Sequence, residues 1–348
     1  MNDFAENTAC FDVSPLSCMV DLHLHLDGAI FPASARKLAK LQGIAIPESD
    51  AELLKLMQVD EDCRDLNEFL EKFAFPCSLI QTKEGIREAM ADLLKELKTQ
   101  GVMYAEVRFA PQKSTEKGLT QEEVVEAALS GIENSGMDAG LILCCMRGDD
   151  NREENLETVR VAEKYLEKGV VAVDLAGAEA LFATGNFADV FSLAKKKKIP
   201  VILHAGEADG PESVREALRF GASRIGHGVR SLEDEALVKE LAEKKIPLEG
   251  CPTSNVQTQT VPSLAAWPLR EMCAAGLVIT INTDDPSISG TSIKEEYRKL
   301  IRQFGLKKED VRALLKNAVT ASFAKEATKK KLFQKIDREF DRKTGAKR

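Results

Sequence analysis

The chain has 348 residues, of which 44% are hydrophobic and 30% are charged, and these proportions are typical of a globular protein with a sizeable core rather than of a disordered or fibrous one. The formal net charge of -8 argues against the phosphate backbone of a nucleic acid, or an anionic membrane surface, as the main partner. A neutral or weakly charged small molecule suits this charge better.

The chain begins with MNDFAENTACFDVS, which has neither a basic region nor a long apolar run and therefore predicts no signal peptide. No later stretch approaches the roughly 18 apolar residues that a membrane span needs. The eight cysteines include no CxxC pair, so free thiols in a reducing cytosol are the expected state. We therefore expect a cytoplasmic protein, and the sequence leaves its oligomeric state open.

Short β-branched runs alternate with helical patterns for most of the length, which is typical of repeated βα units with a parallel sheet. Helical spacing is clear in IREAMADLLKELK, NLETVRVAEKYLEKG and EALVKELAEKK. Eight candidate strands are the number of a (β/α)8 TIM barrel, and no linker or repeat divides the chain, so we predict one α/β barrel domain over 1–348. The candidate strands are 19–25, 102–109, 139–146, 170–176, 201–205, 222–227, 246–251 and 278–282.

Residues 30–100 separate the first two candidate strands and are too many for one crossover helix, so they predict a helical insertion that caps the barrel mouth. Within it, LNEFLEKFAF at 66–75 repeats apolar residues at helical spacing. This pattern suits either core packing, which is the simpler interpretation, or the apolar wall of a pocket. Charged helical patterns at the end of the chain predict extra C-terminal helices.

All four histidines are expected at one end of this barrel. His23 and His25 lie two residues apart on the first strand, and residues i and i+2 of a strand point to the same face, here the barrel interior. His204 and His227 fall at the C-terminal ends of the fifth and sixth strands. This is the end at which barrel enzymes build their active sites.

The segment NTDDP follows the eighth strand and places Asp284 and Asp285 at the same mouth. Alone, this pair could cap a turn or a helix, but barrel closure brings Asp284 within reach of His23 and His25. With His204 they form three imidazoles and one carboxylate, a set suited to zinc that leaves one position open for water, as in catalytic sites. The sequence therefore predicts one Zn2+ per chain, held by His23, His25, His204 and Asp284.

The motifs HLHLDGA, DLAGAE, HAGE, RIGHG, CPTSN and NTDDP, in this order, resemble the adenosine deaminase family of the amidohydrolase superfamily. The resemblance implies the same four zinc ligands and a purine nucleoside as the small-molecule partner. It also implies the reaction, which is the hydrolytic deamination of adenosine and 2′-deoxyadenosine to inosine and 2′-deoxyinosine plus ammonia. This reaction belongs to purine salvage.

The same resemblance implies roles for individual residues. Glu207 matches the family's proton-transferring acid, and His227 matches the histidine beside the zinc-bound water. Asp285 matches the carboxylate that faces purine N7, Gly177 the backbone donor to purine N3, and Asp27 the residue that meets the ribose. The substrate-binding group is thus His25, Asp27, Gly177 and Asp285.

The reaction explains these residue types. Zinc lowers the pKa of bound water toward neutrality, and addition of hydroxide to C6 puts charge on N1, so an acid such as Glu207 is needed there. An ionised Asp285 could not donate to N7, which is itself an acceptor. Burial and a neighbouring carboxylate both raise the pKa of a carboxyl group, so a neutral Asp285 is physically reasonable.

Two positions differ from the family pattern. Trp267 stands where relatives commonly have a histidine before the proline, and we interpret it as a packing change. Ala178 stands where many relatives carry aspartate. Together they leave room for a modified adenosine as the substrate.

Three other functions compete with this interpretation. Deamination of free adenine is disfavoured by Asp27, because base-specific members tend to carry glutamate there. A two-metal amidohydrolase usually needs a carboxylated lysine on the fourth strand, and VVAVDLAG contains none. A catalytically inactive nucleoside-binding relative would have lost Glu207 or a metal ligand, and the sequence retains them.

Overall fold

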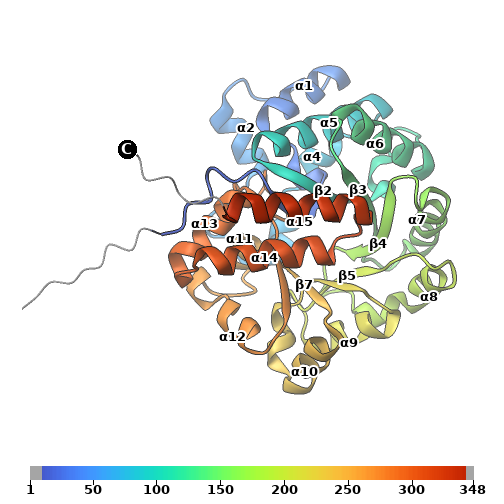
Figure 1. Ribbon diagram of the computed structural model, residues 1–348. Coiled ribbons are helices and arrows are strands. Elements are labelled where there is room, and N and C mark those ends of the chain that lie inside the picture. The colour runs from blue at the N-terminus through green and yellow to red at the C-terminus, as the bar shows by residue number, and fades with distance from the viewer. Residues whose placement is uncertain (1–9, 342–348) are drawn as a thin grey trace, which may run out of the picture.

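The computed structural model describes residues 10–341, so the two ends of the predicted domain, 1–9 and 342–348, lie outside the described residues. Within them, eight strands alternate with helices around a central barrel (Figure 1). All eight predicted strands are confirmed, with ends shifted by at most two residues. The strands are β1 (Met19–His25), β2 (Val102–Phe109), β3 (Ala139–Met146), β4 (Val170–Ala176), β5 (Ile202–Ala205), β6 (Arg224–His227), β7 (Pro247–Gly250) and β8 (Val278–Ile281).

Two parallel sheets of the described chain, β1-β2-β3-β4 and β5-β6-β7-β8, join into a closed barrel. One bridge pairs Val173 of β4 with Val201 beside β5, and another pairs β1 with Asp284, just past β8. The second seam is tied by His25 N donating to Asp284 O at 2.8 Å and Asp284 N donating to His23 O at 2.8 Å. The (β/α)8 class is thereby confirmed, and Asp284 lies directly against the strand that carries the first two histidines.

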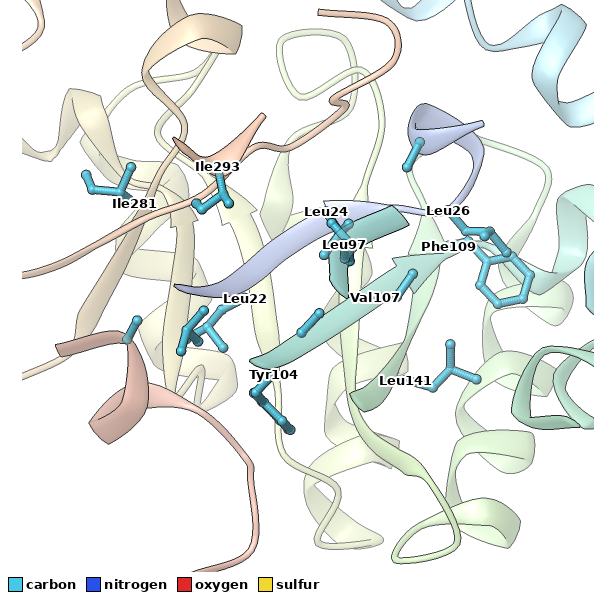
Figure 2. Packing of buried hydrophobic residues seen from close by; sticks show 14 of the residues in the cluster. Leu22, Leu24, Leu26, Leu97, Tyr104, Val107, Phe109, Leu141, Ile281 and Ile293 are labelled. Carbon is cyan, nitrogen blue, oxygen red and sulfur yellow. The ribbon is translucent and has the colours of Figure 1, made fainter. Parts of the chain in front are cut away.

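The side chains of β1 point alternately to the apolar core outside the barrel and to the barrel interior. Leu22 and Leu24 are fully buried in the main apolar cluster with Val107 of β2 (Figure 2). Side chains of successive strand residues point to opposite faces, so His23 and His25 face the barrel interior. The pleat of one strand thus anchors the outer core and presents two imidazoles.

Charged side chains fill the barrel interior beneath the histidines. Arg108 on β2 contacts Asp174 at 2.7 Å and Glu249 at 2.8 Å. Arg224 on β6 contacts Glu249 at 2.6 Å and also pairs with Glu106. All five side chains are at most 1% exposed, and buried charges are tolerated when they are paired in this way.

The insertion between β1 and β2 forms the predicted helical cap, and its last helix, α5, packs beside β2 as a barrel helix. Leu66, Phe69 and Leu70 of α3, with Phe73 and Ala74 that follow them, line a pocket at the barrel mouth, so the pocket-wall interpretation of 66–75 is correct and core packing alone is not. Phe69 serves both purposes, because it also packs with Cys63 and Ile288 in a small separate cluster. The cap helices are α1 (Pro32–Gln42), α2 (Asp50–Met57), α3 (Leu66–Glu71), α4 (Ala74–Ser78) and α5 (Lys83–Thr99).

The C-terminal helices α14 and α15 lie side by side against the barrel (Figure 1), as predicted. The turn after α14 covers the end opposite the histidines, where Arg224 donates to Ala321 O at 2.8 Å and Phe323 N donates to Glu106 at 2.6 Å. No helix among residues 10–341 is both long and apolar enough to span a bilayer. The helices after the cap are α6 (Gln121–Ser135), α7 (Arg152–Tyr165), α8 (Ala188–Lys196), α9 (Pro211–Phe220), α10 (Glu235–Lys244), α11 (Pro252–Gln257), α12 (Leu269–Ala274), α13 (Ile293–Phe304), α14 (Lys308–Ala321) and α15 (Glu326–Asp341).

Candidate active site

The four predicted metal ligands converge at the C-terminal end of the barrel. His25 Nε2 lies 3.1 Å from His204 Nε2 and 3.4 Å from Asp284 Oδ1, and His23 Nε2 lies 3.1 Å from the same oxygen. In a tetrahedral zinc site with bonds of about 2.1 Å, neighbouring ligand atoms are about 3.4 Å apart, so these spacings suit one shared ion. His23 Nε2 is buried and makes no hydrogen bond within the described residues, which also fits a cation-binding atom.

A fourth histidine competes for the same position. Ligand atoms of His23, His204, His227 and Asp284 all lie within 4.8 Å of one another, whereas His25 falls in a second such group with Asp284 and Asp285. All of these side chains are buried. Distances alone therefore admit His227 as readily as His25 to the set of metal ligands.

Two carboxylates from the interior charge network orient the imidazoles. His23 Nδ1 lies 2.8 Å from Glu249, and His204 Nδ1 lies 2.9 Å from Asp174. An ionised carboxylate only accepts, so each imidazole donates its Nδ1 proton, and in the neutral form it presents the Nε2 lone pair to the site. Arg108 contacts both carboxylates and so ties the two orienting groups together.

Glu207 is held at the mouth by the loop after β5. Glu179 accepts from four consecutive amides, those of residues 206–209, at 2.7 to 3.1 Å, and this fixes the loop that carries Glu207. The Glu207 side chain lies 3.5 Å from His227 Nε2 and 3.2 Å from the Thr258 hydroxyl. Burial, followed by the nearby charges of Asp284 and Glu179, raises the pKa of Glu207 well above its usual value. This direction favours the protonated form of Glu207.

The surroundings of Asp285 also favour the neutral form of its carboxyl group. Burial and then the charge of Asp284 raise the pKa of Asp285 well above its ordinary value, in the direction expected from the sequence. Its Oδ1 is buried without a hydrogen-bond partner among the described residues. A side chain on Gly28 would place its Cβ 1.7 Å from that oxygen, so glycine is required there for Asp285 to turn into the site.

These groups line a pocket of about 550 Å³, within the range of small-molecule sites. Gly177 lies on its wall with φ of +109°, a conformation that favours glycine. Asp27 Oδ1 has no hydrogen-bond partner within residues 10–341, Oδ2 lies 3.7 Å from Cys77 Sγ, and burial raises the pKa of Asp27 to about 6. The predicted site residues on the wall are His25, Asp27, Gly177, His204, Glu207, His227, Asp284 and Asp285.

The two positions that differ from the family pattern lie in different places. Ala178 is on the pocket wall, whereas Trp267 is 1% exposed and packed behind β7. His23, the remaining predicted ligand, is fully buried beneath the pocket.

Several site residues were not predicted. Asp174 and Glu179 both stand in the motif DLAGAE, and Asn255 stands in CPTSN, but the motifs by themselves indicate no role for them. Glu249 lies outside all of these motifs. Alternation of side chains along the short strand β7 turns Glu249 into the barrel interior, and an acidic side chain on a buried strand is the sequence feature that could have indicated a role for it.

Comparison with known proteins agrees with this geometry. A family model described as Adenosine deaminase matches residues 18–339. The adenosine deaminase of Haemophilus ducreyi is 48% identical over 331 residues, covering 92% of this chain and 96% of that protein, and the adenosine deaminase of Enterococcus faecalis is 40% identical over 325 residues, with the same coverage. The crystal structure of an adenine deaminase from Arthrobacter aurescens superposes with a TM-score of 0.82 at 29% identity, covering 92% of this chain and 98% of that one. This chain therefore belongs to the adenosine deaminase family.

Proposed function

We propose that this protein catalyses the zinc-dependent hydrolytic deamination of adenosine and 2′-deoxyadenosine. The observation that carries the proposal is the cluster of His23, His25, His204 and Asp284 at a pocket that Glu207 also lines. The relatives named adenosine deaminase support the choice of substrate. The products are inosine or 2′-deoxyinosine and ammonia.

The proposed chemistry divides between the metal and the side chains. Bound zinc would lower the pKa of water and so supply the nucleophile at neutral pH. Glu207 gives its proton to purine N1 as C6 becomes tetrahedral. The Glu207 carboxylate then takes the proton of the hydroxyl group added at C6 and passes it to the amine, so that the C6–N bond breaks with release of ammonia and the C6 carbonyl forms. His227 and Asp284 hold the incoming oxygen in line with C6, which is a positioning contribution.

The remaining wall residues would orient the nucleoside. Asp285 donates its proton to purine N7, which an ionised carboxylate could not do. The Gly177 amide faces N3, and Asp27 accepts from a ribose hydroxyl. Apolar residues of α3 and α4 cover the base and exclude water.

The substrate assay uses the purified protein and the loss of adenine-type ultraviolet absorbance. Adenosine and 2′-deoxyadenosine should both be consumed, and the panel should include N6-substituted and 5′-modified nucleosides because Ala178 lines the pocket. Absence of turnover with every adenine nucleoside, in a protein that contains its metal, would refute the proposed function.

One divalent metal ion per chain is expected, because the four proposed ligands share a single position. Elemental analysis of the purified protein should find about one equivalent of zinc, and exhaustive chelation should abolish turnover. Two stoichiometric ions, or full activity after chelation, would contradict the single-ion site.

Alanine substitutions of the adjacent aspartates Asp284 and Asp285 should have different effects on metal content. Asp284→Ala removes a proposed ligand, so metal content and activity should both be lost. Asp285→Ala should keep the metal and lose turnover, because its proposed partner is the purine. Metal content measured beside activity separates the two variants, and equal metal loss in both would overturn the assignment.

A further inference from the structure

A buried hydrogen-bond chain connects Trp267 to the active site. Trp267 Nε1 lies 3.1 Å from Asn255 Oδ1, and Asn255 Nδ2 lies 3.1 Å from His227 Nδ1. All three side chains are at most 1% exposed. The indole ring packs against Gly250, where a Cβ atom would lie only 2.7 Å from the ring. This close contact holds Trp267, the first member of the hydrogen-bond chain, in place.

The direction of every bond in this chain follows from its first member. An indole N–H can only donate, so the Asn255 amide must turn its oxygen toward Trp267. Its NH2 group then faces His227, so Nδ1 of that imidazole must accept. A neutral imidazole that accepts at Nδ1 carries its proton at Nε2.

The other orienting contacts impose the opposite tautomer. His23 and His204 meet the carboxylates Glu249 and Asp174, so they donate from Nδ1 and present Nε2 as a lone pair. His227 meets an amide NH2 group instead, and its Nε2 carries a hydrogen. This nitrogen points toward Glu207 Oε2 at 3.5 Å and Asp284 Oδ2 at 3.9 Å.

We propose that Trp267 is a positioning residue that, through Asn255, holds His227 in the Nε2-protonated tautomer. His227 is thereby a hydrogen-bond donor in the active site and is excluded from the metal shell, although its distance to the other ligand atoms would admit it. The effect on turnover rests on the proposed function, whereas the tautomer itself does not.

The direct test is the ¹⁵N NMR spectrum of the imidazoles in full-length protein, with and without zinc. Only four histidines are present, and His227→Gln identifies the signals of His227 by their loss. In the wild type, Nδ1 of His227 should give a pyridine-type signal and Nε2 a pyrrole-type signal in both samples. A pyrrole-type Nδ1 at His227 in the wild type would overturn the proposal.

Two variants test the hydrogen-bond chain from Trp267 to His227. Asn255→Asp keeps the size of the side chain but can only accept when ionised, so His227 should switch to the Nδ1-protonated tautomer. Trp267→Phe removes the donor and lets the Asn255 amide rotate, so the share of Nε2-protonated His227 should fall. A single cooperative thermal transition in each variant verifies folding, and retention of the wild-type tautomer in both would refute the role of Trp267.

The kinetic readout distinguishes positioning from loss of structure. In Asn255→Asp, kcat for adenosine should fall by about 10²- to 10³-fold, as for loss of one aimed donor, while KM and zinc content stay near the wild-type values. An unchanged kcat despite a switched tautomer would contradict the catalytic consequence. A wild type with the expected tautomer but no adenosine turnover would refute the proposed function alone.

Discussion

Glu207→Gln is expected to lower kcat for adenosine by about 10²- to 10⁴-fold or more, which is the typical contribution of acid-base catalysis. An amide has nearly the size of the carboxyl group but cannot transfer the proton that N1 requires. The backbone around Glu207 is held by Glu179, so the loop should keep its shape in the variant. Zinc content and the dissociation constant for inosine should therefore match the wild type.

The matched control is Glu212→Gln, a glutamate on α9 whose side chain is 66% exposed. It makes the same carboxyl-to-amide replacement in a nearby part of the chain, and kcat should not change. Steady-state kinetics with adenosine, elemental analysis and equilibrium dialysis with inosine provide the three measurements. A fully active Glu207→Gln enzyme would remove the proposed mechanism.

Adenosine and 2′-deoxyadenosine should be deaminated with far higher kcat/KM than free adenine. A site built to hydrogen-bond a group can reject the analogue lacking it by about 10⁴- to 10⁵-fold in favourable cases. Asp27 offers such a bond, because Oδ1 is buried without a partner among the described residues. Its pKa of about 6, raised by burial, leaves the carboxylate mainly ionised and ready to accept at pH 7.5.

Asp27→Ala should reduce the preference for adenosine over adenine, whereas Asp62→Ala, an exposed position in the cap, should leave it unchanged. The 5′-phosphorylated nucleotide should be a poor substrate, since Asp27, Glu71 and Glu116 line the pocket with Lys113. The other cation of the wall, Arg147, already donates to the carbonyl oxygens of Phe182 and His204. Equal efficiency on adenine and adenosine would refute the nucleoside assignment and leave the metal chemistry standing.

Local patterns were sufficient to predict the barrel and its mouth. The eight strands are short apolar runs, and the spacing of His23 and His25 gives their common face from strand geometry alone. The approach of Asp284 to β1 then follows from closing eight strands into a ring, and the structure shows that bridge. Each of these inferences uses the geometry of a single strand or of two neighbouring strands, so none requires knowledge of the whole fold.

The partners beneath the histidines could not be predicted in this way. Arg108 on β2 contacts Glu249 on β7, 141 positions along the chain, and alternating charges on a strand more often face water than a barrel interior. The sequence does not indicate the role proposed for Trp267, for a related reason. Its place before the last crossover helix and away from the metal ligands predicts packing, and the indole is indeed buried. The partners of its N–H group, Asn255 and then His227, become visible only in the folded structure.

The most direct test of hydrolytic deamination in this site is the reaction of zinc-loaded protein with adenosine in ¹⁸O-labelled water, followed by mass spectrometry of the nucleoside and determination of ammonia. We expect inosine with one ¹⁸O atom at C6 and one ammonia per inosine, and almost no product from Glu207→Gln under the same conditions. Inosine without the label, product without ammonia, or equal yields from the two proteins would contradict addition of water at C6 with Glu207 as the proton donor.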